Sequence, residues 1–207
     1  MRGREAEARR NDRAVLDAAR RVFAFHGPEA PVSAVAAEAG VGMGSLYRRY
    51  PSKEALLNDL CLQSMGEMLE AGQRALQQQD GWTALCWFIR ECVTFRAGAF
   101  VVAAGWVHPT DEMITTAQRC RAMVEELVSQ ARAAGALRPG ATGVDVQLLI
   151  ELFSRRRPGD TAYPRLLTMA LDGLAATGST AALPDPAPTW EAYVARWRPN
   201  ARPPGGP

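Results

Sequence analysis

Residues 39–56, AGVGMGSLYRRYPSKEAL, combine glycines with hydroxyl and cationic side chains in a way that could hold a phosphate backbone. Gly42 and Gly44 carry no side chain, so the backbone beside them can approach a partner closely. Tyr47 and an arginine follow, and the chain's single lysine, Lys53, comes shortly afterwards. Hydroxyl and cationic groups bind phosphate oxygens, and arginine also binds base edges. The stretch therefore predicts contact with nucleic acid.

Two short helices joined by a sharp turn must position these residues. We expect the first over about 31–39, ended by Gly40, because glycine tolerates the positive φ that such a turn often needs. We expect the second over about 42–49, with Leu46 and Tyr50 directed inward. This arrangement is a helix-turn-helix, whose second helix enters the major groove of DNA with its first turns.

The residues after the second short helix extend the predicted contact. Pro51 breaks the chain, and Ser52 is placed to cap the free amides of a long third element. Lys53 at the start of that helix brings a charge and nearby free amides toward a phosphate.

Each cationic or aromatic candidate also has a simpler interpretation. Tyr47 could be a core aromatic, but two neighbouring residues already fill the inward positions of its helix. Lys53 could be a solvated surface charge, but it is the single lysine among 24 cationic residues. Arg48 and Arg49 could both be solvated, and we favour Arg48 as the one that faces DNA.

Residues 10–60 resemble the TetR family of bacterial transcriptional regulators. The matching residues are Val35-Ala36, Gly40-Val41, Leu46-Tyr47, Tyr50, Pro51-Ser52-Lys53-Glu54 and Leu56. The resemblance implies that Tyr47 and Lys53 touch the phosphate backbone and that residues 42–45 and 48 face the bases. It also implies a helical C-terminal domain that dimerises and often holds a small-molecule pocket.

The chain departs from the family pattern at several positions, of which the replacement of the commoner Phe by Tyr50 is harmless. The family often has Thr or Ser at the start of the second helix, where Ser33 is the nearest substitute here. Met43 and Gly44 offer little hydrogen bonding, so affinity would depend on phosphate contacts and DNA shape. The candidate DNA-binding residues are Ser33, Gly42, Met43, Gly44, Ser45, Tyr47, Arg48 and Lys53.

Helical periodicity continues through the rest of the chain and predicts an all-α fold of about nine to ten helices. Residues 1–9 are expected to form a loose arm before a first helix from Asn11 to His26. Further helices are predicted at 52–80, 82–93, 99–107, 110–134, 143–155, 162–176 and 189–197. The stripes at 144–152 and 163–174 could be core or dimer seam, and the family resemblance favours the seam.

These elements suggest two domains and a tail. We expect a TetR-type DNA-binding domain at 10–69, with its helix-turn-helix motif at about 33–52. A helical regulatory and dimerisation domain follows at 70–198, and 199–207 form a Pro/Gly-rich tail. Six large side chains of the second domain could line a ligand cavity or simply pack: Trp82, Trp87, Phe95, Phe100, Trp106 and Met113.

Bulk properties place the chain among ordinary globular proteins. It has 207 residues and a net charge of +2, so no global basic field indicates nucleic acid. Its four cysteines form no CxxC pair, and a redox-sensing pair of Cys86 and Cys92 is the minority interpretation. The charged N-terminus does not resemble a secretory leader, and the longest apolar run is about half of a membrane span. We therefore expect a cytoplasmic protein.

No enzyme motif competes with the regulator hypothesis. The sequence contains no nucleophile elbow, Walker loop, HExxH or clustered His/Cys/Asp set, so we predict no catalytic residue, metal or cofactor. The prediction is a homodimeric repressor that binds a palindromic operator in double-stranded DNA and is released by a small-molecule effector. The alternative is a small-molecule or redox sensor with weak DNA binding.

Overall fold

The computed structural model describes residues 2–97, 107–155, 161–177, 181–184 and 186–195. Within these residues the chain forms helices only, apart from one isolated bridge between Leu137 and Ala175. The helices are α1 (Arg2–His26), α2 (Val32–Ala39), α3 (Met43–Arg49), α4 (Lys53–Leu76), α5 (Gly81–Thr94), α6 (Asp111–Ala133), α7 (Gly143–Ser154), α8 (Tyr163–Leu174) and α9 (Trp190–Ala195). The all-α prediction is confirmed. The helix predicted at 99–107 lies almost entirely outside the described residues.

The beginning of the chain differs from the prediction of a loose arm at 1–9. Helix α1 starts at Arg2 and continues without a break to His26. The physical reason lies in the stretch REAEARR, whose Glu, Ala and Arg residues are strong helix formers.

Helices α1 to α3 and the first half of α4 enclose one hydrophobic cluster. Its members include Val15, Ala18 and Phe23 of α1, with Leu56 and Leu60 of α4. Small residues allow these short helices to cross closely, because an alanine side chain adds little to the distance between helix axes.

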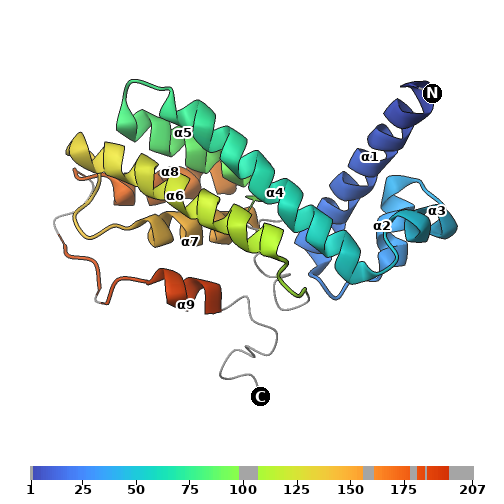
Figure 1. Cartoon of the computed structure of the whole chain (residues 1–207). Coiled ribbons are helices and arrows are strands. Elements are labelled where there is room, and N and C mark those ends of the chain that lie inside the picture. Colours follow the sequence, from blue (N-terminus) through green and yellow to red (C-terminus); the bar gives the residue numbers. More distant parts are fainter. Residues whose placement is uncertain (1, 98–106, 156–160, 178–180, 185, 196–207) are drawn as a thin grey trace, which may run out of the picture.

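The second hydrophobic cluster is formed by the remaining helices. Phe88 of α5, Leu127 of α6, Ile150 of α7 and Leu171 of α8 are all buried in it. The second half of α4 joins this cluster through Ala71 and other small residues, so one helix of about 36 Å connects both clusters (Figure 1). The N-terminal unit therefore sits at one end of α4 and the larger helical unit at the other.

Polar contacts fix the joint between the two units. The Arg20 guanidinium on α1 donates to Glu67 Oε2 of α4 at 2.6 Å and to the backbone oxygen of Phe95 at 3.0 Å. Its side chain is only 11% exposed, so this ion pair is shielded from solvent screening. Val107 and Met113 add apolar contacts, because both are buried in the N-terminal cluster although they flank the start of α6.

Candidate DNA-binding interface

The turn between α2 and α3 depends on Gly40. Its φ of 67° and ψ of 28° lie in the left-handed region, where a side chain would add strain. The Gly40 amide donates to the carbonyls of Ala36 and Ala37, and the Val41 amide also donates to the Ala36 carbonyl, which closes the end of α2. The chain thus reverses within a few residues, and α3 begins at Met43.

The inner face of α3 is anchored by Leu46 and by Tyr50, which follows its last turn. Both side chains are 2% exposed, and the Tyr50 amide donates to the Leu46 carbonyl at 2.8 Å. The prediction that these two residues face inward is therefore confirmed. A seven-residue helix is only marginally stable by itself, so α3 depends on the packing of these two side chains for its stability.

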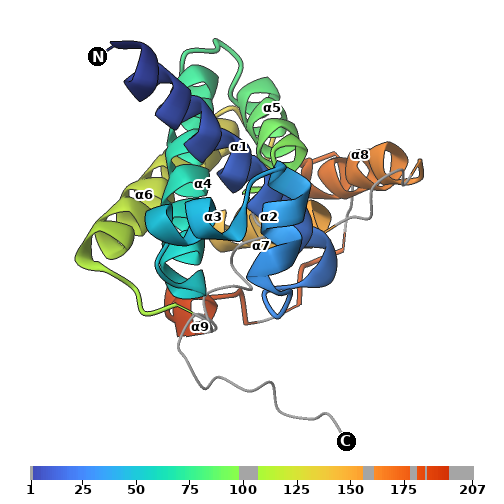
Figure 2. The same cartoon turned by 90° about the vertical axis from the view of Figure 1, so that its right-hand side faces the viewer.

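The outer face of α3 is open to solvent. Tyr47 is 47% exposed and Met43 is 37% exposed, although both are large apolar side chains. Gly42, Gly44, Ser45 and Arg48 are exposed as well. Residues 43 and 47 are one helical turn apart, as are 44 and 48, so the helix presents them as two adjacent rows. Figure 2 shows α3 on the outer side of the N-terminal unit, in front of α4.

Ser33 lies on α2 rather than on the recognition helix. It is exposed at the second position of α2, whose N-cap is Pro31 and has no side-chain hydrogen bond. Ser33 is therefore a residue of the first turn of α2, and its hydroxyl does not cap the helix. The structure leaves it at the surface, where a partner can reach it.

The start of α4 places Lys53 next to the helix N-terminus. Ser52 Oγ accepts a hydrogen bond from the Ala55 amide at 3.1 Å, as the sequence predicted for this cap. The Lys53 ammonium is half-buried and lies 5.7 Å from the centroid of the Phe23 ring. Partial burial lowers the pKa of Lys53, while Glu29 acts in the opposite direction. The lysine is thus held against α1 and α4 at the exposed edge of the unit.

Two other arginines of the N-terminal unit are already engaged in structural contacts. Arg20 is bound to Glu67 and Phe95, and Arg21 Nε donates to Glu38 Oε1 at 2.7 Å. Within residues 14–60, the remaining Lys and Arg residues belong to α3 and to the first position of α4.

Sequence reasoning missed the contact between His108 and Glu54. The backbone amide of His108 donates to Glu54 Oε1 at 3.0 Å, and His108 Nδ1 lies 2.8 Å from the same oxygen. The hydrogen bonds from His108 lower the pKa of the Glu54 carboxyl. Taken locally, Glu54 suits the positive end of the α4 dipole and His108 stands beside Pro109, so neither residue points to the other. No local signal could reveal a pair 54 positions apart in the sequence.

The described residues offer no cluster suited to a metal ion. No group of three or more His, Cys, Asp or Glu residues is placed to hold a metal ion there. Among the described helices, none combines the length and the apolar character needed to cross a membrane. What the site offers is an exposed short helix with glycines, a tyrosine and cations, which suits the major groove and flanking phosphates.

Comparison with known proteins agrees with this geometry. Residues 15–60 match the family of bacterial regulatory proteins described as the tetR family. The TetR transcriptional regulator SCO0520 from Streptomyces coelicolor is 29% identical, with a TM-score of 0.55 over 80% of this chain and 99% of that chain. No curated protein matches the chain.

Two further solved structures share the fold. The TetR-like transcriptional regulator LfrR from Mycobacterium smegmatis, in complex with proflavine, is 23% identical, with a TM-score of 0.57 over 84% of this chain and 99% of that one. AibR in complex with isovaleryl coenzyme A and operator DNA is 18% identical, with a TM-score of 0.60 over 80% and 98% of the two chains.

Proposed function

We propose that this chain, which belongs to the TetR family of bacterial regulatory proteins, represses transcription as a homodimer on a palindromic operator and leaves it when a small molecule binds. It is a DNA-binding transcriptional regulator, a class without enzymatic activity. To this class we add four proposals: repression, dimerisation, release by a ligand and a cytoplasmic location. The observation that carries the proposal is the exposed outer face of α3, held in place by the buried Leu46 and Tyr50.

In this proposal the outer face of α3 enters the major groove. Residues 42–45 bring the backbone close to the bases, and Arg48 reaches a base edge or phosphate. Tyr47 and Lys53 bind phosphate oxygens, and Ser33 adds a hydroxyl from α2. Their exposure and their placement along α2, α3 and the start of α4 support these roles. With little hydrogen bonding from Met43 and Gly44, most of the affinity comes from phosphates and DNA shape.

Exposed apolar side chains on α7 and α8 support the homodimer. Leu152 is 70% exposed, Leu166 is 51% exposed and Met169 is 60% exposed. Large apolar side chains at such exposure on neighbouring helices mark a surface that a partner covers. The apolar residues predicted at 144–152 and 163–174 therefore have two roles. Leu167 and Leu171 pack in the core, and we assign the exposed residues to the dimer seam. To read a palindromic operator, the proposed dimer has to hold its two α3 helices in successive turns of the major groove, about 34 Å apart.

We also propose a division of the chain into a DNA-binding domain at 10–69 and a regulatory domain at 70–198. The change of cluster along α4 supports a boundary near this place, because Cys61 packs in the N-terminal cluster and Ala71 in the C-terminal one. The tail at 199–207 lies outside the described residues.

The effector is proposed to bind within the C-terminal helices. LfrR and AibR, which share the fold, were solved with proflavine and with isovaleryl coenzyme A. In this chain Trp82, Trp87 and Phe95 are half-buried against the C-terminal cluster, where they could line a ligand site. Met113, which the sequence grouped with them, instead packs in the N-terminal cluster. Phe100 and Trp106 lie outside the described residues.

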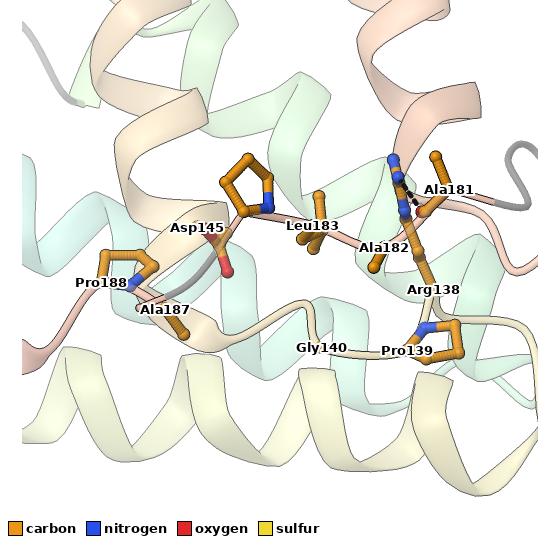
Figure 3. Close-up of a pocket in the computed structure, with 10 residues that line it drawn as sticks. Arg138, Pro139, Gly140, Asp145, Ala181, Ala182, Leu183, Ala187 and Pro188 are labelled. Atoms are coloured by element: carbon orange, nitrogen blue, oxygen red, sulfur yellow. Dashed lines mark hydrogen bonds between the residues drawn. The ribbon is translucent and has the colours of Figure 1, made fainter.

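A surface pocket of about 550 Å³ is a poor candidate for the effector site. It lies between the loop that joins α6 to α7 and residues 181–184 and 187–188 (Figure 3). Its Arg138 guanidinium donates to the carbonyls of Gly173 and Ala181, and its Asp145 carboxylate accepts from Thr142 in a capping box. Both charged groups are therefore already used to hold the fold together.

The start of α6 provides a physical connection between effector and DNA. Val107 and Met113 are buried in the N-terminal cluster, and His108 binds Glu54, the neighbour of Lys53. A ligand that favours a different position of residues 107–113 would therefore move the start of α4 relative to DNA. We propose that binding shifts the population toward a dimer whose α3 helices no longer match the operator spacing.

The redox-sensing alternative is disfavoured by the thiols themselves. Burial raises the pKa of Cys86 to about 11 and the pKa values of Cys61 and Cys120 to about 12. Burial likewise raises the pKa of Cys92 well above its ordinary value. Because the thiolate is the reactive form, these cysteines react slowly near neutral pH.

The first test is selection of bound duplexes from a random-sequence pool by the full chain near physiological salt. We expect an enriched palindrome, and the Tyr47→Phe variant should bind it more weakly without a change in the preferred sequence, since a phosphate contact carries no base information. Salt-sensitive retention without an enriched sequence would contradict the proposal. A compound that binds the chain at saturation but leaves operator affinity unchanged would contradict the ligand step for that compound.

A further inference from the structure

Arg20 of α1 is a shielded cation that binds segments of both units. Its guanidinium donates to Glu67 Oε2 of α4 at 2.6 Å and to the backbone oxygen of Phe95 at 3.0 Å. Glu67 lies between Cys61, which packs in the N-terminal cluster, and Ala71, which packs in the C-terminal one. Phe95 follows the last residue of α5 in the C-terminal unit. One side chain of the DNA-binding unit thus bonds α4 at the change of cluster and the end of α5 at the same time.

The two acceptors of Arg20 are themselves held in place. The other carboxylate oxygen of Glu67 accepts a hydrogen bond from Gln63 Nε2 at 3.0 Å, so the carboxylate cannot turn without losing a bond. Phe95 is the C-cap of α5, and Arg96 after it has a φ of 59°, a left-handed conformation that ends the helix. The last carbonyls of a helix have no intrahelical donor, and the negative end of the helix dipole favours a cation there. Arg20 therefore binds two acceptors of fixed position.

The Arg20 contact restricts rotation between the units more than the other contacts across the joint. A guanidinium is a planar fork, so two hydrogen bonds from it define a direction as well as a distance. Val107 and Met113 contribute apolar contacts, and hydrophobic attraction has no preferred direction. His108 also joins the units through Glu54, but its side chain is 83% exposed, where water competes for the hydrogen bond. The Arg20 side chain is only 11% exposed, so its bonds are both directional and shielded.

The orientation of the DNA-binding units decides which operator a dimer fits. One additional base pair between two half-sites moves the second half-site by about 3.4 Å along the duplex and by about 35° around it. A dimer with rigid joints accepts one spacing, because any other spacing requires the DNA to be twisted or bent. A dimer whose DNA-binding units can rotate on their joints accepts several spacings with similar affinity.

We propose that Arg20 fixes the orientation of the DNA-binding unit on the C-terminal unit and thereby determines which half-site spacing the dimer accepts. Arg20 is then a positioning residue, which acts through the placement of α3 and needs no contact with DNA itself. This inference rests on the proposed function, because it requires a dimer on a palindromic operator.

The test compares substitutions at two adjacent arginines of α1. Arg20→Gln removes the charge, and Arg20→Lys keeps the charge but lacks the planar fork, while both substitutions preserve helix propensity. The control is Arg21→Gln, because Arg21 Nε donates to Glu38 Oε1 of α2 at 2.7 Å, within the DNA-binding unit. Fluorescence anisotropy gives the affinity of each full chain for the selected operator and for duplexes with one or two base pairs inserted or removed between the half-sites. Circular dichroism checks that each variant folds.

We expect the wild type and Arg21→Gln to bind the altered spacings at least about tenfold more weakly than the selected spacing. For Arg20→Gln this ratio should fall to about threefold or less, and Arg20→Lys should give an intermediate ratio. A residue that only stabilised the fold would weaken binding to every spacing equally and would leave the ratio unchanged.

A wild-type ratio in both Arg20 variants would overturn the inference and leave the proposed function in place. An equal fall of the ratio in Arg21→Gln would overturn it as well, because the loss would then follow from charge alone. If Arg20→Gln does not fold, the ratio of Arg20→Lys decides between these outcomes. Failure of the proposed function looks different: the wild type itself selects no palindrome, and the role of Arg20 in spacing is overturned with it.

Discussion

The N-terminal and C-terminal units of this protein use the same building block, the packed helix, in opposite ways. In the N-terminal unit a seven-residue helix is held by two buried side chains so that its other face stays exposed. In the C-terminal unit, long helices bury stripes of large residues such as Phe88 and Leu127. Packing in the first unit presents a surface, and packing in the second builds a core.

Glycine shows the same contrast. At Gly40 the backbone has a φ of 67° and a Cβ would meet no atom within 4 Å, so the residue is needed for conformation and not for space. At Gly81, the first residue of α5, a Cβ would lie 2.8 Å from the backbone carbon of Gln130 on α6. There the residue is needed for the close approach of two helices.

The largest expected effects on stability come from substitutions that leave a cavity in one of the two hydrophobic clusters. Phe88→Ala should destabilise the C-terminal unit by about 3–5 kcal/mol, and Leu46→Ala should destabilise the N-terminal unit by about 2–5 kcal/mol, because both side chains are buried. Differential scanning calorimetry distinguishes the units: if they unfold separately, each variant shifts a different transition. A single transition shifted by both variants would show that α4 couples them into one cooperative unit.

The two glycines allow a sharper version of this comparison. Gly81→Ala should cost about 1–3 kcal/mol, because the new methyl group meets backbone that cannot rotate away. Urea unfolding measures this decrease in stability. An unchanged midpoint would mean that α5 can move away from α6 without cost, and the close approach would then be incidental.

In the N-terminal unit, Gly40→Ala should cost about 1–2 kcal/mol through left-handed strain alone. Gly44→Ala is the matched control, since Gly44 lies within α3 and a methyl group on its Cα would meet no atom within 4 Å. Alanine at 44 should leave stability equal or slightly higher. Operator affinity should nevertheless fall for Gly44→Ala if the backbone of α3 approaches the bases, as gel-shift titration would show.

Lys53 and its neighbour test the edge of the DNA-binding surface. Lys53→Ala should reduce the salt slope of operator binding by about 0.9 for each protomer, whereas Lys53→Arg should retain it because the charge remains. Fluorescence anisotropy titrations at several salt concentrations give both slopes. Equal slopes for the wild type and Lys53→Ala would assign the lysine to packing against Phe23.

The smallest effect concerns the contact between the units. Hydrogen bonds from His108 lower the pKa of Glu54 below its ordinary value of 4.5, so the contact stabilises the folded protein above that pH. This stabilisation disappears as the pH falls through the lowered pKa of the folded state. Glu54→Gln should therefore have a slightly lower Tm than the wild type at about pH 6, and the difference should vanish under more acidic conditions. A constant difference at all pH values would show that ionisation of Glu54 is irrelevant.

Much of the N-terminal unit could be predicted because its signals are local. Gly40, Pro51 and the Ser52 cap each act on the backbone within a few residues, so the boundaries of α2, α3 and α4 follow from neighbours in the chain. The inward orientation of Leu46 and Tyr50 follows from helical spacing. The arm at 1–9 was predicted wrongly because charge was taken as a sign of disorder, although Glu, Ala and Arg favour a helix.

The C-terminal unit could be predicted only as a set of amphipathic helices. The periodicity at 163–174 shows which residues are apolar, but it does not show which of them are buried in the core. The structure buries Leu167 and Leu171 and exposes Leu166 and Met169. That partition depends on where α5 and α7 lie beside α8, which is a property of the assembled helices.

The sequence by itself determined the helical class, the turn at Gly40, the caps and the residues that α3 can offer to DNA. These are consequences of backbone conformation and of spacing along one chain segment. Only the tertiary structure decided that His108 meets Glu54 and that Arg20 joins α1 to the end of α5. Each of these depends on the folding of distant segments against one another, and no local pattern encodes the distance between them.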